Sequence, residues 1–272
     1  MRFLKLLVFL SATVLLAGCA NVKGLKLLAP EPFGLRALAP DVYIESSADE
    51  QAVLDLHSAL FRAREAVHVA YGGVASHPIV HACVTEDCYA RFGGQGSRAK
   101  VYGDYILLSP RGLSWHFLAH EWSHAELRTR LNFRAWWALP VWFDEGLAVA
   151  VSEAPEHSEA HWQFLVANDI PRPSREALLA CTTGRQWLDA VRRYGERPNA
   201  ERRARGEPEI RPVYAAAGHE LRLWLSRVGD AGLRSLIERL NDGESFERVY
   251  PGLYESRGPG VARAPGRVEG ME

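Results

Sequence analysis

The sequence lacks an excess of charge of either sign, and it lacks an apolar run long enough to cross a membrane. Its 32 lysines and arginines nearly balance 33 aspartates and glutamates, which leaves a formal net charge of −1. This balance gives no support for a polyanionic partner such as nucleic acid. The almost wholly apolar segment at residues 6–16 is too short to span a bilayer as a stable helix. The composition, 47% hydrophobic and 24% charged, is typical of one globular domain, or a domain of two lobes, with flanking segments.

The N-terminus has the pattern of a secretory signal. A short basic start precedes the apolar segment, which ends in Leu16, Ala17, Gly18 and Cys19. This ending resembles the lipobox of bacterial lipoproteins, which implies cleavage before Cys19 and acylation of its thiol and new amino group. Ala20 resembles the sorting pattern of outer-membrane lipoproteins. We therefore expect a lipid anchor at a membrane that faces the periplasm, the outer membrane if the cell has one. An ordinary cleaved signal followed by a chance cysteine is the alternative.

Cysteine is scarce, with only three besides Cys19. Export permits a disulfide, but three thiols cannot all pair. Cys83 and Cys88 are closest in sequence, which favours this pair. Three buried free thiols, Cys181 among them, are the alternative.

The chain divides into four parts. Residues 1–18 form the signal, and residues 19–41 form the lipidated cysteine and a tether with little periodicity. Residues 42–254 carry the patterns of a folded domain, which we expect to be monomeric. Residues 255–272 combine glycine, proline and charge without a pattern, which predicts a disordered tail.

Within the domain, the patterns predict strands first and helices later. Strands are expected at 42–44 and 79–84, and a hairpin at 98–102 and 105–108 turning at Gly103-Asp104. One helix runs from the Ser47 to Glu50 capping box to Gly72, and another begins at Ser109-Pro110. Later helices are expected near 140–154, 156–168, 174–181, 185–194, 213–227 and 230–240. The arginine-rich residues 195–212 predict a long mobile loop.

The most informative motif lies in the helix after Ser109. His120, Glu121, Trp122, Ser123 and His124 fit the pattern H-E-x-x-H. Residues four apart on a helix differ by about 40° in direction and about 6 Å in height, so two imidazoles can bind one ion. The carboxylate that follows the first histidine points about 100° away, which suits a general base. A stripe that runs from Leu113 to Leu131 through both histidines predicts that they face inward.

A catalytic zinc site needs a third protein ligand and an open position. Glu145, in the run from Pro140 to Ala148 early in the next expected helix, is the obvious candidate. Buried histidines without a metal are the alternative.

These two segments together resemble the gluzincin zinc peptidases, and Trp142 to Ala148 is close to the form seen in bacterial peptidase-MA-like proteins. The resemblance implies a zincin-like α+β fold, with a small mixed β-sheet packed on the H-E-x-x-H helix and a mainly helical C-terminal lobe. It also implies Zn²⁺ held by His120, His124 and Glu145, with Glu121 as general base towards a zinc-bound water. Residues 105–110 fall where the family has its substrate-side edge strand.

Several other residues are weaker candidates for a role at the site. The resemblance favours Tyr214 over His219 as an oxyanion-stabilising donor, and a satisfied core tyrosine is the alternative. Asp144 is expected to be a solvated first-turn carboxylate favoured by the helix dipole, and an outer-shell partner for a ligand histidine is the alternative. His116 is expected to pack or to support the site. Gly146 is expected to bring its helix close to the H-E-x-x-H helix.

For two further groups of residues we predict a structural role and not a functional one. The aromatic residues Phe133, Trp136, Trp137, Trp142 and Phe143 are expected to pack between the two motif helices, with an apolar cleft or membrane contact as alternatives. The arginines from 192 to 211 are expected to be solvated.

The resulting expectation is a zinc-dependent peptidase of the cell envelope that hydrolyses a peptide or protein substrate. A zincin-like lipoprotein that binds a peptide or envelope partner without turnover is the alternative function, and a structural domain without metal is a third.

Overall fold

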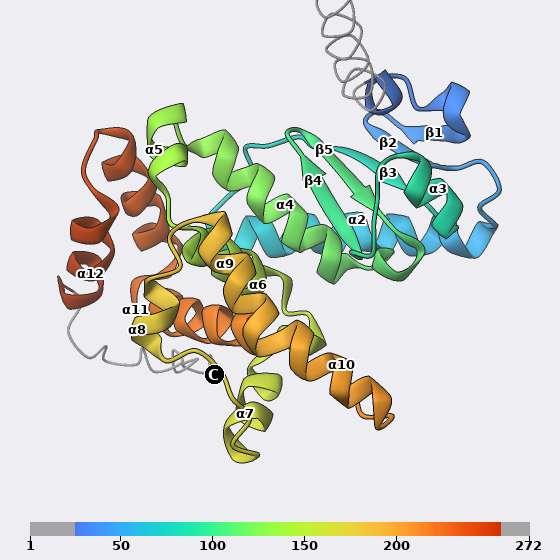
Figure 1. The fold of residues 1–272 in the computed structure, drawn as a ribbon. Helices are drawn as coiled ribbons and strands as arrows, with labels where there is room; N and C mark the ends of the chain where they lie inside the picture. The colour runs from blue at the N-terminus through green and yellow to red at the C-terminus, as the bar shows by residue number, and fades with distance from the viewer. Residues whose placement is uncertain (1–24, 257–272) are drawn as a thin grey trace, which may run out of the picture.

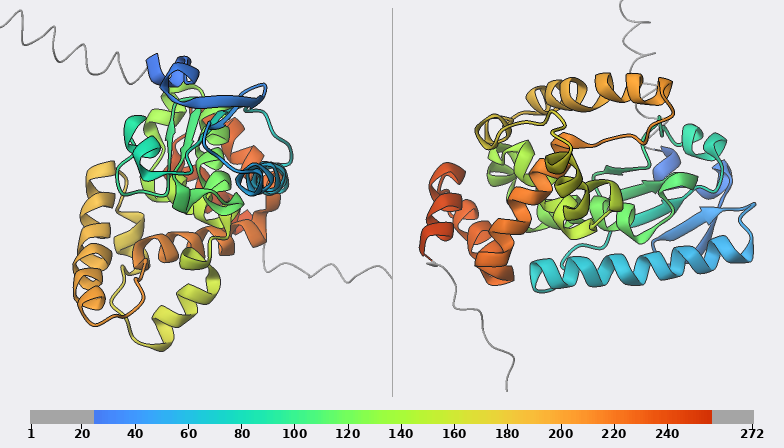
Figure 2. Two further views of the ribbon diagram at one scale, coloured as in Figure 1. Left: turned by 90° about the vertical axis from the view of Figure 1, so that its right-hand side faces the viewer. Right: turned by 90° about the horizontal axis from the view of Figure 1, so that it is seen from below.

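The computed structural model describes residues 25–256 and has an α+β fold, as expected (Figure 1). The predictions about the signal, about Cys19 and about the tail beyond residue 256 lie outside these residues, whereas the first two residues of the expected tail, Glu255 and Ser256, are helical. Within them, no helix combines the length and the apolar character that crossing a membrane requires. The strands lie in the first half of the chain, and the last helix, α12 (Phe246–Ser256), and the first strand, β1 (Leu35–Ala39), lie at opposite ends of the molecule (Figure 2).

A mixed sheet of five strands forms one half of the molecule. Its strands are β1 (Leu35–Ala39), β2 (Val42–Glu45), β3 (Ile79–Ala82), β4 (Ala99–Tyr102) and β5 (Tyr105–Leu108), in the order β1-β2-β3-β5-β4. The pairs β2–β3 and β3–β5 are parallel, whereas β1–β2 and β4–β5 are antiparallel. The expected hairpin is confirmed, and Gly103 in its turn has φ +64°. The expected edge is wrong, because β5 is paired on both sides and β4 is the edge strand.

The side chains of β5 alternate between two apolar layers, as the period of a strand requires. Ile106 and Leu108 join the main core with α2 (Glu50–Tyr71) and α4 (Trp115–Arg130). Tyr105 and Leu107 face a smaller cluster around α3 (Glu86–Arg91). A disulfide between Cys83 and Cys88 joins the end of β3 to α3, and Cys181 is free and buried. The favoured pairing is therefore confirmed.

Helices make up most of the second half. They comprise α5 (Phe133–Ala138), α6 (Val141–Ser152), α7 (Glu159–Ala167), α8 (Arg175–Leu179), α9 (Gly184–Val191), α10 (Arg197–Ala204), α11 (Pro212–Asn241) and α12 (Phe246–Ser256). Single turns lie at Glu31–Phe33, Pro110–Gly112 and Pro155–His157, and Arg192–Glu196 is a π-helix. Gly229 interrupts α11 with φ +66°, at the break expected between residues 227 and 230.

Three boundaries differ from the expectation. The tether was expected to reach residue 41, but Leu35–Ala39 is β1, and Leu35 is buried against the disulfide cluster. Residues 195–212 are not a long mobile loop, because Arg192–Glu196 and α10 are helical and the Asn199 amide exchanges hydrogen bonds with the backbone of Ile210. The helix expected from Ser109 begins at Trp115, after a single turn capped by Ser109.

Two packing expectations are wrong. Gly146 lies against α11 rather than α4, since a Cβ there would lie 2.8 Å from the carbonyl oxygen of Ala217. On α5, Phe133 and Trp137 are 76% and 75% exposed, so the aromatic cluster does not pack as one unit. Its members Trp142 and Phe143 are buried, as expected.

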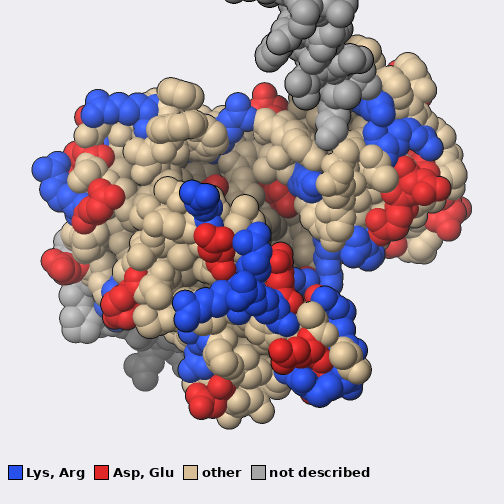
Figure 3. Space-filling model, in the orientation of Figure 1, with Lys and Arg blue, Asp and Glu red and all other residues tan. Residues whose placement is uncertain are grey.

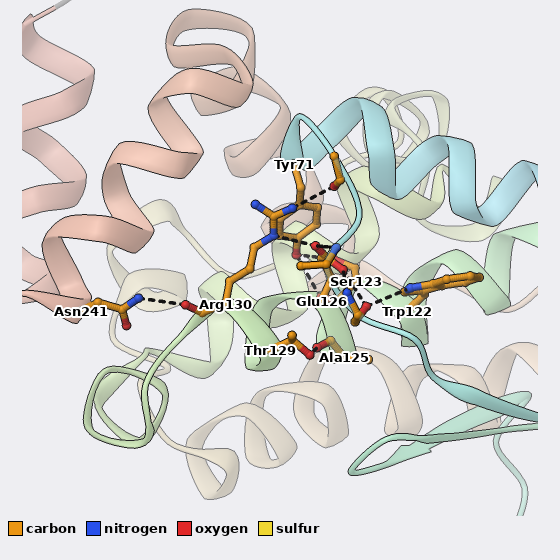
Figure 4. Close-up of polar contacts among 11 residues, drawn as sticks. Tyr71, Trp122, Ser123, Ala125, Glu126, Thr129, Arg130 and Asn241 are labelled. Atoms are coloured by element: carbon orange, nitrogen blue, oxygen red, sulfur yellow. Dashed lines mark hydrogen bonds and ion pairs between the residues drawn. The ribbon is translucent and has the colours of Figure 1, made fainter. Parts of the chain in front are cut away.

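A buried carboxylate fixes the rear face of α4 (Figure 4). Glu126 accepts hydrogen bonds from the N–H groups of Ala75 and Ser76 (both 2.8 Å), from the Ser76 hydroxyl (2.6 Å) and from Arg130 Nε (2.6 Å). Burial alone would raise the pKa of Glu126, but these donors outweigh it and lower the pKa below its usual value. The α2–β3 loop and α4 are thereby joined.

The same loop receives further contacts from α4. Trp122 Nε1 donates to the Ser76 hydroxyl (3.0 Å), and the Arg130 guanidinium donates to the carbonyl of Gly73 (2.9 Å). The Tyr71 hydroxyl donates to the carbonyl of Ser123 (3.0 Å). These groups are buried or half-buried. Breaking one of the contacts would therefore cost free energy, because water does not reach the groups to replace it.

Replacing Glu126 by alanine is expected to lower the free energy of unfolding by about 3–5 kcal/mol, because a buried charge pair loses one partner and several donors lose their acceptor. Urea denaturation of both proteins measures the change. Glu65→Ala, at an exposed position of α2, is the matched control and is expected to change stability by less than about 0.5 kcal/mol. A similar small change in Glu126→Ala would contradict this role.

Candidate metal centre

The two motif histidines lie on the front face of α4, where it borders a cleft. The residues of α4 that are fully buried, among them Leu118, Trp122 and Glu126, lie on the opposite side. The histidines face inward as expected, and their stripe forms one wall of the cleft. Leu127 and Leu131 are buried, and the side chains of His120 and His124 are only 14% and 13% exposed.

His120, His124 and Glu145 are brought together by the packing of α4 on α6. Their nearest candidate ligand atoms lie within 4.8 Å of one another. The Nε2 atoms of the two histidines are 3.3 Å apart. One oxygen of Glu145 lies 3.6 Å from His120 Nε2 and 3.9 Å from His124 Nε2. Three such atoms around one point suit a single ion of the size of zinc, with bonds of about 2.0–2.2 Å.

Asp144 orients one of the histidines. Its oxygen lies 2.8 Å from Nδ1 of His124, so this ring nitrogen donates to the carboxylate and Nε2 stays free for a ligand. A carboxylate behind a histidine is the usual arrangement around protein-bound zinc, because it fixes the ring and strengthens its basicity. The outer-shell interpretation of Asp144 therefore fits, and the solvated one does not.

The potential at this point is negative. Burial lowers the pKa of His124, but Asp144, followed by Glu145 and Glu121, outweighs burial and brings the pKa to about 10. Burial also raises the pKa of Glu145, and the two histidines outweigh it and lower this pKa. Carboxylates that favour a proton on an imidazole also favour a cation between imidazoles. The donor set thus fits a divalent ion.

Glu121 stands beside this set without being part of it. Burial raises the pKa of its carboxyl, and a hydrogen bond from the backbone N–H of Val101 on the edge strand works in the opposite direction. A carboxylate with a raised pKa is a better proton acceptor near neutral pH. The edge strand therefore holds the carboxylate at the border of the cleft.

The cleft runs past the site as two adjoining cavities. The first, about 450 Å³, extends towards Arg98 and is called the Arg98 arm; the second, about 700 Å³, extends towards Arg128 and is called the Arg128 arm. Both are lined by Ala99, His120, Glu121 and Tyr214. Figure 3 shows the hollow, with acidic side chains inside it and basic ones over α9 and α10. An extended chain can pass along both arms and over the candidate ligands.

Tyr214 reaches the site from the start of α11. Burial raises the pKa of its hydroxyl, so it stays protonated and can donate a hydrogen bond. Its ring stacks on His157 at 5.0 Å. No motif in the sequence singles out His157, the last residue of the turn Pro155–His157. It is nonetheless buried, lines the Arg98 arm, lies 6.4 Å from the ring of His120, and has no hydrogen-bond partner for Nδ1 among the residues described.

Two other histidines have structural roles. His116 Nδ1 lies 2.7 Å from the carbonyl oxygen of Ser152, so it supports the contact of α4 with the end of α6. His219 pairs with Glu159 at 3.0 Å and stacks on Trp162 at 4.6 Å, and it lines neither arm of the cleft. Of the two oxyanion candidates, only Tyr214 therefore borders the site.

Comparisons with protein-family models, with curated proteins and with solved structures find no match for this chain.

The full chain is expected to bind about one zinc ion, and His120→Ala is expected to lose it, because two ligands of the set do not hold zinc tightly. Elemental analysis of protein purified in detergent measures the metal. His77→Ala, in the loop before β3, is the matched control. Zinc content that stays at one ion in His120→Ala would place the ion elsewhere.

Asp144→Asn is expected to keep the site but to weaken zinc binding by about 10- to 100-fold, because the amide cannot stabilise the ring of His124 as a carboxylate does. Competition with a chelator of known affinity gives the Kd. An unchanged Kd would mean that Asp144 does not act on the metal site.

Proposed function

We propose that this protein is a zinc-dependent peptidase of the gluzincin type that hydrolyses peptide bonds in the cell envelope. The observation that carries the proposal is the meeting of His120, His124 and Glu145 within 4.8 Å, with Glu121 beside them in an open cleft. Each of these residues belongs to a motif recognised in the sequence. The α+β architecture, in which a small mixed sheet packs on the H-E-x-x-H helix, is compatible with a zincin-like fold.

The residues divide the work of hydrolysis. When bound, zinc would polarise the substrate carbonyl and lower the pKa of the attacking water. Glu121 accepts a proton from that water and passes it to the nitrogen of the leaving amine. The hydroxyl of Tyr214, kept protonated by burial, donates to the oxygen on which negative charge develops. The ring of His157 holds the tyrosine in place by stacking at 5.0 Å.

The edge strand provides a place for the substrate backbone. Among the described strands, β4 pairs with β5 alone, and its residues Ala99, Lys100 and Val101 line the cleft. An extended peptide can add to such an edge through main-chain hydrogen bonds. This mode leaves side chains of the substrate pointing alternately into the cleft and away from it.

The proposed location of the protein, at a membrane facing the periplasm, is supported by two features of its cysteines. The lipobox-like sequence at Cys19 implies a lipid anchor and a face towards the periplasm. The Cys83–Cys88 disulfide supports this location, because stable disulfides form mainly in oxidising compartments outside the cytosol.

Glu121→Gln is expected to retain zinc and fold while losing turnover by at least about 100-fold, since general-base catalysis contributes about 10²–10⁴. A pool of randomised, end-blocked octapeptides, analysed by mass spectrometry after incubation with the zinc-loaded full chain, measures cleavage. Glu65→Gln, on the exposed side of α2, is the control. Peptides that bind to the native chain but are never cleaved would favour the alternative function, a peptide-binding lipoprotein without turnover.

A further inference from the structure

The two arms of the cleft differ in how their basic residues are paired. In the Arg98 arm, Arg98 lies 3.1 Å from Glu156, and Arg211 lies 2.8 Å from Glu209. In the Arg128 arm, Lys100 and Arg128 make no ion pair with any residue from 25 to 256. Because the cations of one arm are neutralised and those of the other are not, the arms present different charges to a ligand.

Arg128 is held at the far end of its arm. It follows His124 by one turn of α4, and its guanidinium lies 5.9 Å from the centre of the Trp136 ring on α5. On the other side it reaches the β4–β5 turn, where a Cβ on Gly103 would lie 3.0 Å from Arg128 Nη1. Since this glycine has φ +64°, the turn itself favours the residue that leaves room for the guanidinium.

Lys100, on the edge strand β4, also lines this arm. The two cations therefore come from the two elements that flank the arm, the strand and the helix. Figure 3 shows basic side chains at the rim of the hollow on the side of α4 and β4.

Each acidic residue that lines this arm already has a partner or belongs to the candidate metal site. Asp144 is bonded to His124 at 2.8 Å, Glu145 belongs to the metal set, and Glu121 is held by the backbone of Val101. None of them is free to neutralise Lys100 or Arg128. A complementary anion must therefore come from the ligand.

We propose that the Arg128 arm binds a carboxylate of the peptide substrate, so that Lys100 and Arg128 select an acidic group on this side of the cleaved bond. The guanidinium can bind a carboxylate through two parallel N–H···O contacts, and the ammonium adds a second charge. The selection for cleavage rests on the proposed function, whereas the binding of a carboxylate does not depend on turnover.

The expected preference is moderate, because both cations are in contact with water. Exposed ion pairs contribute about 0.2–1 kcal/mol each, so two of them predict a preference of about two- to thirtyfold for an acidic group over its neutral isostere. The preference should shrink as salt is added, since screening acts strongly on exposed charges.

Binding is tested with the zinc-loaded full chain carrying Glu121→Gln, so that no peptide is consumed. Two pools of randomised octapeptides are equilibrated with it, one with amidated and one with free C-termini, and the bound peptides are quantified by mass spectrometry. Enrichment of glutamate over glutamine at one position in the amidated pool indicates an acidic side chain. Enrichment only in the pool with free C-termini indicates the terminal carboxylate. Either result supports the proposal.

The variants separate recognition from general charge. Arg128→Gln and Lys100→Gln are each expected to bring the glutamate-to-glutamine ratio towards one, and Arg128→Glu is expected to favour lysine instead. Arg64→Gln, at an exposed position of α2 that makes no ion pair within the described part of the chain, is the matched control and should leave the ratio unchanged.

The outcomes also separate this inference from the proposed function. A glutamate-to-glutamine ratio of one without any enrichment in the pool with free C-termini, absence of bound peptide, or an acidic preference that survives in both Gln variants would overturn the inference. Acidic enrichment without any cleavage by the native chain would leave the inference in place and count against the peptidase. Cleavage by the native chain without an acidic preference would support the peptidase and overturn the inference.

Discussion

The buried carboxylate of Glu126 is the interaction on which the geometry of the site depends. It lies two residues after His124, which places it about 200° around α4, on the face opposite the histidine. Its hydrogen bonds to the α2–β3 loop and to Arg130 hold the rear of the helix against the first half of the molecule. The front face, with His120 and His124, is thereby presented to the cleft in one orientation, which a metal site requires.

A second constraint acts within the helical half of the molecule. Gly146 allows α6 to approach α11 so closely that a side chain there would meet the backbone of Ala217. The preceding residues of α6, Asp144 and Glu145, then face α4, while the start of α11 brings Tyr214 to the same cleft. The candidate ligands and the candidate donor are thus positioned by a single tight contact between helices.

The motif residues and the local elements could be predicted because their signals are local. Residues four apart share a helix face whatever surrounds the helix, so the pairing of His120 and His124 needs only the helix. The hairpin at Gly103 and the Cys83–Cys88 disulfide likewise depend on residues close in sequence. The strand β1 was missed because its partner β2, and not its own pattern, stabilises it. The helix α10 was missed because its sequence is polar. The hydrogen bonds between Asn199 and the backbone of Ile210 stabilise it, and they join residues that no local pattern connects.

The sequence by itself determined the chemistry of the site: two imidazoles and a carboxylate at helical spacing, and a further carboxylate in the next helix. Only the tertiary structure decided which face of α4 is open, because apolar periodicity does not distinguish a buried stripe from the wall of a cleft. It also decided that Asp144 supports His124, that His157 stacks on Tyr214, and that Lys100 and Arg128 make no ion pair with any described residue. These relations join residues from separate elements, and their distances depend on how the helices and the sheet pack together.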